Sequence, residues 1–143
     1  MKNYDILFIC EANVGRSQMA EGYYNAFTGG KRAISAGIKN VIKKYSGKPA
    51  PKIIKVMEKD DIDISSQRIK VFSADMADKV KHIIVLCEKH ICPAQLIRSP
   101  KTRIMPIQDP YNMSINGVTK IRDAIKELVK ILIKQDLSFI AKT

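Results

Sequence analysis

The chain has 143 residues, 45% of them hydrophobic, and this size and composition predict one globular domain over residues 1–143 rather than a disordered chain. No stretch is apolar for long enough to cross a bilayer, and the sequence enters a strand pattern almost at once, so we expect neither a membrane partner nor a signal peptide. The net charge of +11 comes from scattered lysines without interleaved aromatic residues, which argues against a nucleic-acid partner and favours a solvated surface that attracts anionic substrates.

A strand, a short polar turn and a helix are predicted in direct succession near the start of the chain. Apolar and aromatic residues fill positions 4–9, interrupted only by Asp5, which is typical of a strand buried on both faces. Good helix formers begin at Gln18, and residues recur at helical spacing to about Phe27. Cys10 therefore ends a central strand, and Arg16 lies where the helix begins.

This placement predicts an anion site beside a nucleophile. Backbone N–H groups of a turn that enters a helix carry partial positive charge and suit a tetrahedral oxyanion. These dipoles and the guanidinium of Arg16 favour the thiolate form of Cys10, while the planar fork of Arg16 can hold two phosphate-like oxygens. The expected phosphate-binding residues are Glu11, Ala12, Asn13, Val14, Gly15, Arg16 and Ser17.

Three residues of this loop have expected backbone or hydrogen-bonding roles. Gly15 lets the backbone approach the anion closely, and Asn13 tolerates a left-handed conformation. Ser17 either donates a hydrogen bond to the sulfur or caps the helix.

The remaining elements alternate between strand and helix. Strands are predicted at 32–36, at 82–86 and, weakened by Pro106, at the sheet edge over 103–107; helices are predicted at 51–59, from Ser73 through Val80, and from about 116 to 137. A long loop over 37–51 separates the second strand from the second helix, and Pro93 opens a short helix or turn.

Such alternation predicts an α/β fold with a four-stranded parallel sheet and helices on both faces. Ligands of these sheets bind beyond the carboxyl ends of the strands, so Cys10, Cys87 and the Asp109 loop should open on one rim.

Three segments carry a family resemblance. The segment CEANVGRSQMAEG resembles the signature of the low-molecular-weight protein tyrosine phosphatases, which share their fold with thioredoxin-coupled arsenate reductases. Ile34-Ser35-Ala36-Gly37 and Asp109-Pro110-Tyr111 resemble two further motifs of the phosphatases, the second containing the general acid.

The resemblance implies a phosphomonoester hydrolase that forms a phosphocysteine. Cys10 would attack phosphorus, Arg16 would clamp the oxygens, and Asp109 would protonate the leaving group and then activate water, with no metal or other cofactor. The implied substrate is a phosphotyrosine protein or a small aryl phosphate. Tyr45 and Tyr111 are candidates for the aromatic walls of its pocket, with ordinary packing as the alternative.

Other features resemble the arsenate-reductase branch, namely residues 16–22, residues 65–67, and Cys87 with Cys92 before a proline. In that branch the two cysteines relay a disulfide from the nucleophile to thioredoxin after arsenate reduction. The gap between Cys87 and Cys92 is shorter than usual, and Gly15 stands where both branches usually carry a second cysteine.

The cysteines allow blander interpretations as well. Three cysteines without a disulfide framework indicate a reducing cytoplasm, where Cys87 and Cys92 could be ordinary buried thiols. A zinc site of these two with His82 and His90 is disfavoured, because a predicted strand separates His82 from Cys87. A non-catalytic protein that binds anions or nucleic acid through its basic surface is the remaining alternative.

Overall fold

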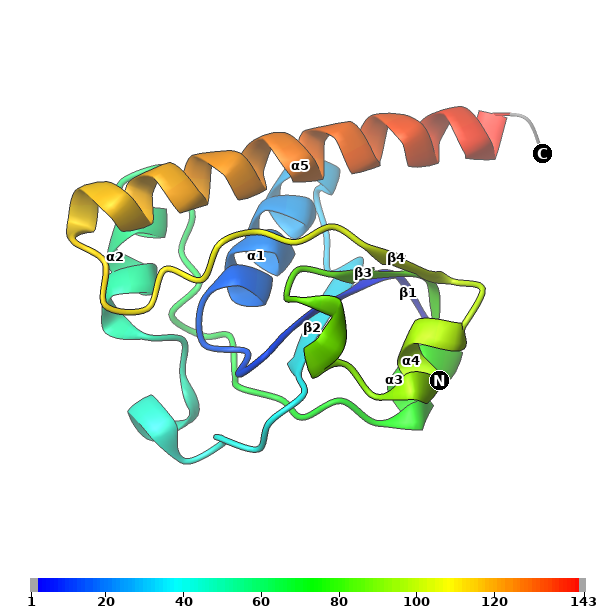
Figure 1. The fold of residues 1–143 in the computed structure, drawn as a ribbon. Helices are drawn as coiled ribbons and strands as arrows, with labels where there is room; N and C mark the ends of the chain where they lie inside the picture. Colours follow the sequence, from blue (N-terminus) through cyan, green and yellow to red (C-terminus); the bar gives the residue numbers. More distant parts are fainter. Residues whose placement is uncertain (1–2, 142–143) are drawn as a thin grey trace.

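The computed structural model describes residues 3–141, with side chains to residue 135. The elements follow the chain as β1 (Tyr4–Cys10), α1 (Arg16–Thr28), β2 (Ala33–Gly37), η1 (Lys44–Gly47), α2 (Pro51–Glu58), α3 (Ala74–Asp78), β3 (Val80–Val85), η2 (Lys89–Ile91), α4 (Ala94–Arg98), β4 (Thr102–Ile104) and α5 (Ile115–Ala141). The strands form one four-stranded sheet in the order β2-β1-β3-β4, and each neighbouring pair is parallel (Figure 1). The predicted parallel sheet is confirmed.

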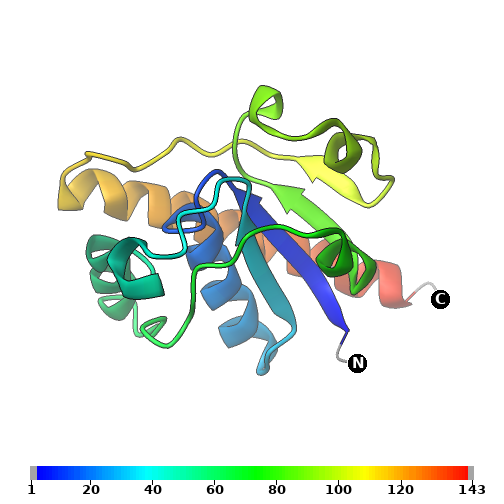
Figure 2. The same ribbon diagram turned by 90° about the horizontal axis from the view of Figure 1, so that it is seen from below.

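Helices cover both faces of this sheet, as predicted (Figures 1 and 2). Ile6 and Phe8 of β1 pack with residues of α1, α2 and α5, whereas Leu7 and Ile9 pack toward the other face, which includes Leu96 of α4. Successive side chains of a strand point to opposite faces, so a strand between two cores must be apolar at every position. This explains why residues 6–9, directly before Cys10, are all apolar, and it places Cys10 at the end of a central strand.

Two strand boundaries differ from the prediction. The short helix ends at Asp78 rather than running through Val80, because Val80 pairs with Tyr4 and already belongs to β3. β4 lies at the sheet edge as expected but ends at Ile104, and Pro106 shortly beyond it has no N–H to donate.

The long connection between β2 and α2 contains a turn that the sequence did not predict. In η1 the backbone is left-handed at Tyr45 (φ 49°) and Ser46 (φ 57°), and Gly47 follows with φ 79°. Left-handed backbone is uncommon for residues with a side chain, so this turn is held by its surroundings.

The buried Tyr23 of α1 links this helix, through Asp60, to the end of α2 and to α5. The Tyr23 hydroxyl donates to Asp60 over 2.7 Å, and the Lys126 ammonium donates to the same carboxylate over 2.9 Å. These bonds, with Lys126 the larger contribution, lower the pKa of Asp60, while burial raises the pKa of Tyr23. The final helix begins at Ile115, within a residue of the prediction, and no described helix is long and apolar enough to span a membrane.

Candidate active site

The carboxyl end of β1 opens into a cavity of about 390 Å³. Its floor is made by the loop that joins β1 to α1, and its walls come from the η1 turn, from α2 and from the segment after β4. The lining residues are Cys10, Glu11, Ala12, Val14, Gly15, Arg16, Lys39, Lys44, Tyr45, Ala50, Lys52, Ile53, Asp109, Pro110, Tyr111, Asn112 and Val118. Of the predicted phosphate-binding residues, only Asn13 and Ser17 do not line this cavity, because both are fully buried beneath the loop.

The Cys10 sulfur accepts hydrogen bonds from beneath the loop. The backbone N–H of Asn13 lies 3.3 Å from it, and the Ser17 hydroxyl oxygen lies 2.9 Å from it. Asn13 has the left-handed conformation expected from the sequence, with φ 58°. Ser17 contacts the sulfur and does not cap α1, whose first flanking residue is Gly15.

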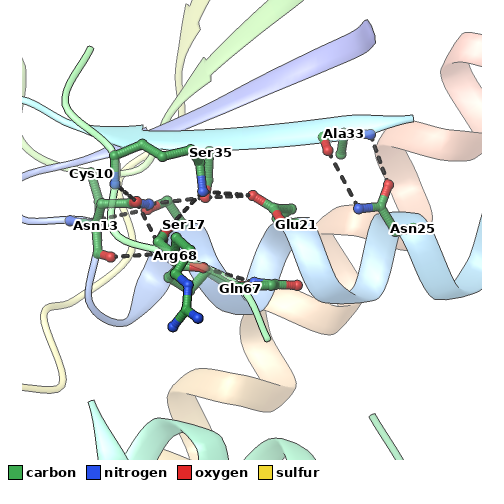
Figure 3. Close-up of polar contacts among 11 residues, drawn as sticks. Cys10, Asn13, Ser17, Glu21, Asn25, Ala33, Ser35, Gln67 and Arg68 are labelled. Carbon is green, nitrogen blue, oxygen red and sulfur yellow. Dashed lines mark hydrogen bonds and ion pairs between the residues drawn. The ribbon is translucent and has the colours of Figure 1, made fainter. Parts of the chain in front are cut away.

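The orientation of the Asn13 amide decides which way these hydrogen bonds run (Figure 3). The backbone N–H of Lys70 can only donate, and it donates to Asn13 Oδ1 over 2.8 Å. Asn13 Nδ2 therefore donates to the hydroxyls of Ser17 (2.7 Å) and Ser35 (2.9 Å). Since the Ser17 oxygen accepts from Asn13, its own hydrogen is free to point at Cys10.

The network continues away from the sulfur to a partly buried ion pair. The Ser35 hydroxyl donates to Glu21 over 2.7 Å, and the Lys70 ammonium lies 3.5 Å from the same carboxylate. Burial lowers the pKa of Lys70, and Glu21 beside it acts in the opposite direction. Lys70 carries no sequence pattern that marks it as part of the site.

Gln18, on the first turn of α1, is a second support that the sequence analysis missed. Its amide nitrogen lies 3.0 Å from both oxygens of Asn13 and 2.8 Å from the Arg68 carbonyl, and Gln67 donates to Gln18 in turn. The complete burial of Gln18 is a property of the fold, and no sequence pattern marks this residue as part of the site.

Arg16 is held in place by backbone carbonyls of the segments that follow β3 and β4. Its Nη1 donates to the carbonyls of Leu86 (3.2 Å) and Ile107 (2.9 Å), and the side chain is only 8% exposed. Its Nη2 lies 3.7 Å from Asp109 Oδ2. The guanidinium is thus fixed on the cavity wall next to a carboxylate, which itself is half exposed and accepts a hydrogen bond from the Tyr111 N–H.

The two predicted aromatic residues lie on separate segments of the cavity wall. Tyr45 comes from η1 and is 38% exposed, and Tyr111 comes from the segment after β4 and is 68% exposed. The Lys44 ammonium lies over both rings, 5.2 Å from the Tyr45 centroid and 5.7 Å from the Tyr111 centroid. Both residues are partly exposed and both line the cavity, so a ligand in the cavity can reach either side chain.

The model of the family described as low molecular weight phosphotyrosine protein phosphatase matches residues 5–138 of this sequence. The chain belongs to this family. Family membership confirms the resemblance inferred from the loop and explains the agreement between the predicted and observed sheets.

Relatives of this family member include proteins named as arsenate reductases. The chain is 31% identical to the glutaredoxin arsenate reductase of Synechocystis over 130 residues (90% of this chain and 95% of that protein). It is 32% identical to the arsenate reductase of Staphylococcus aureus over 129 residues (88% and 93%).

Solved structures of both branches share its fold. Wzb of Vibrio vulnificus in complex with benzylphosphonate superimposes with a TM-score of 0.79 at 21% identity, covering 92% of this chain and 98% of that one. An arsenate reductase in its phosphate-binding state superimposes with a TM-score of 0.75 at 31% identity, covering 94% and 98%.

In this member of the family, Cys87 does not open on the cavity with Cys10 and Asp109, so the expected common rim is wrong for that residue. Cys87 is fully buried and Cys92 nearly so, both packed in the core beneath α4. Burial, with smaller contributions from Cys92 and Cys10 nearby, raises the pKa of the Cys87 thiol to about 12, and burial also raises that of Cys92. Among the described side chains no metal-binding cluster forms, so the zinc alternative has no site.

Of the two glycines beside the cavity floor in this family member, Gly37 leaves no room for a side chain and Gly15 does. A Cβ at Gly15 would lie 3.3 Å from the flexible end of Ile53, a contact that a small movement relieves. A Cβ at Gly37 would lie 2.8 Å from the Ala12 carbonyl carbon and 2.9 Å from the Asn13 nitrogen, both backbone atoms of the floor. The loop can pack on the end of β2 only because Gly37 has no side chain.

Proposed function

We propose that this chain is a phosphomonoester hydrolase of the protein tyrosine phosphatase type, acting on aryl phosphates through a phosphocysteine intermediate. The observation that carries the proposal is the half-exposed Asp109 carboxylate, which stands 3.7 Å from Arg16 on the wall of the cavity that has Cys10 in its floor. A nucleophile, an oxyanion clamp and a proton donor around one cavity are the groups that phosphoryl transfer to sulfur requires.

The reaction would run in two displacements at phosphorus. The Cys10 thiolate attacks the phosphoryl group, the bond from phosphorus to the aryl oxygen breaks, and Asp109 gives its proton to that oxygen so that a phenol leaves. Asp109 then takes a proton from water, the water oxygen attacks phosphorus, and the sulfur–phosphorus bond breaks to release phosphate. Arg16 and the loop N–H groups offset the charge on the equatorial oxygens in both steps.

The sulfur is suited to leave in the second step. The Ser17 hydroxyl and the Asn13 N–H are donors placed for a sulfur that carries negative charge. Tyr45 and Tyr111 would flank the aromatic ring of the substrate, which favours phosphotyrosine or a small aryl phosphate over an alkyl phosphate.

Arsenate reduction is the second candidate, favoured by the identity of 31–32% to proteins named as arsenate reductases and by the presence of Cys87 and Cys92. Cys10 would displace a hydroxyl group of arsenate, as water, to form a sulfur–arsenic bond. Cys87 would then attack the Cys10 sulfur, so that a Cys10–Cys87 disulfide forms while the sulfur–arsenic bond breaks and its electron pair leaves with arsenite. Cys92 would then attack Cys87, free Cys10, and leave a disulfide for thioredoxin to reduce. The full burial of Cys87 and its raised pKa disfavour this route, because attack needs an accessible thiolate.

Two assays on a small set of variants distinguish the candidates. We expect the wild type to hydrolyse p-nitrophenyl phosphate, Cys10→Ser to abolish turnover, Asp109→Ala to lower it by about 100-fold, and Cys87→Ser to leave it near the wild-type rate. Thioredoxin-dependent arsenate reduction that disappears in Cys87→Ser, with little phosphate-ester hydrolysis, would replace the phosphatase by the reductase.

A further inference from the structure

The Lys44 ammonium contacts aromatic rings, unlike the ammonium groups of the other two lysines that line the cavity. Lys39 pairs with Glu11 at 2.6 Å, and Lys52 donates to a backbone carbonyl at 2.9 Å. Among the described side chains no carboxylate lies within ion-pair distance of Lys44, whose ammonium instead lies over the two tyrosine rings. Aromatic faces attract a cation without removing its charge, so Lys44 remains available to an anion.

A second hollow of about 460 Å³ adjoins the cavity and shares Tyr45 with it. It is formed by η1, the residues that follow it and α2 along its length, and apolar residues and lysines both line it. Its other lining residues are Ser46, Lys48, Pro49, Pro51, Ile54, Lys55 and Glu58. We call the cavity and this hollow together the basic groove, because lysines outnumber carboxylates along both parts.

The left-handed turn at Tyr45 and Ser46 gives the basic groove its shape. Backbone conformations of this kind cost free energy in residues with side chains and are retained where the surroundings determine them, often at binding sites. Here the turn puts the Tyr45 ring between the two hollows, where it can bound a phosphotyrosine on one side and support the following residues on the other.

We propose that the basic groove binds an acidic, phosphotyrosine-containing protein segment, with Lys44 pairing with a carboxylate next to the phosphotyrosine. The proposal rests on the phosphatase function proposed above and names its substrate class. The phosphoryl group would sit over Cys10 and the flanking carboxylates would lie along Lys44, Lys48 and Lys55. Charge pairs at a groove that is open to solvent add modest affinity and are weakened by salt.

Three phosphotyrosine peptides of equal length test this, with glutamate, glutamine or lysine on both sides of the phosphotyrosine. Phosphate release is measured at low and at high ionic strength. For the wild type we expect kcat/KM to be about tenfold higher for the glutamate peptide than for the glutamine peptide at low salt, mostly through KM, and lowest for the lysine peptide.

The variants are judged by the ratio of kcat/KM for the glutamate and glutamine peptides. Lys44→Gln and Lys55→Gln should each lower this ratio about threefold, whereas Lys81→Gln, an exposed lysine at the opposite end of β3, should leave it unchanged. Equal kcat/KM for all three peptides, or an equal fall of the ratio in Lys81→Gln, would refute the proposed role of the basic groove and leave the proposed phosphatase activity standing. Absence of phosphate release from every peptide and from p-nitrophenyl phosphate would instead refute the phosphatase itself.

Discussion

Substituting Gly37 by alanine should displace the Cys10 loop without touching a reacting group. The added Cβ would come within 2.8 Å of the Ala12 carbonyl carbon, about 0.6 Å short of an ordinary contact. The strand cannot retreat, because the Gly37 N–H donates to the Lys70 carbonyl and its carbonyl accepts from Phe72. The loop must therefore move by about half an ångström.

The expected loss of rate follows from how little misplacement of reacting groups catalysis tolerates. A misplacement of about 1 Å costs roughly 100-fold in rate, so we expect kcat/KM for p-nitrophenyl phosphate to fall at least about tenfold in Gly37→Ala. The overlap should also lower the free energy of unfolding by about 1–3 kcal/mol. Inhibition by inorganic phosphate should weaken as well, since the same loop holds the anion.

Gly30→Ala is the matched control. A Cβ at Gly30 meets no atom within 4 Å, and this residue does not have a left-handed backbone, so the variant should keep wild-type kcat/KM. Wild-type turnover and phosphate inhibition in Gly37→Ala, with the protein folded, would show that the loop does not depend on its packing against the end of β2.

Three further outcomes are expected. Ser17→Ala, which removes the hydroxyl 2.9 Å from the Cys10 sulfur, should slow p-nitrophenyl phosphate turnover by at least about tenfold in steady-state kinetics; an unchanged rate would mean that the hydroxyl does not stabilise the sulfur anion. Cys87, with its pKa raised to about 12, should react with iodoacetamide far more slowly than free cysteine between pH 7 and pH 9, because its side chain is buried and little thiolate is present. Mass spectrometry of the labelled protein measures this, and fast labelling of Cys87 in the folded protein would contradict it. Asp60→Asn should lower the free energy of unfolding by about 1 kcal/mol at pH 7, and this deficit should vanish in acid. The pKa of Asp60 is lower in the folded protein than its unfolded value of about 4, so the ionised carboxylate stabilises the fold above that pH. This stabilisation is lost as the pH falls through the pKa of the folded state. Urea unfolding at pH 7 and pH 3 measures the last effect, and an equal deficit at both would point to lost packing instead.

The sequence predicted the parts of the fold that depend on local patterns. The apolar run before Cys10, the helix formers after it and the alternation along the chain were enough for the sheet and for the placement of the nucleophile. The left-handed conformation of Asn13 could be expected because a tight loop needs it and asparagine tolerates it.

Long-range contacts could not be predicted in the same way. Lys70 and Gln18 support the loop through partners far along the chain, and nothing near either residue signals this. Cys87 was expected at the rim because it follows a strand, but its side chain points into the core under α4. The direction of a side chain beyond a strand end depends on tertiary packing, which a strand pattern does not contain.

Most of the atoms that grip the Cys10 loop belong to the main chain. The carbonyls of Leu86 and Ile107 hold Arg16, the Arg68 carbonyl holds Gln18, and the Lys70 amide holds Asn13. Every residue carries the same backbone carbonyl, and every residue except proline carries the backbone N–H. Substitution of the side chains at these four positions can therefore leave the hydrogen bonds to the loop in place. A fold whose members share about three residues in ten can in this way change in sequence and keep the backbone contacts that position its anion-binding loop.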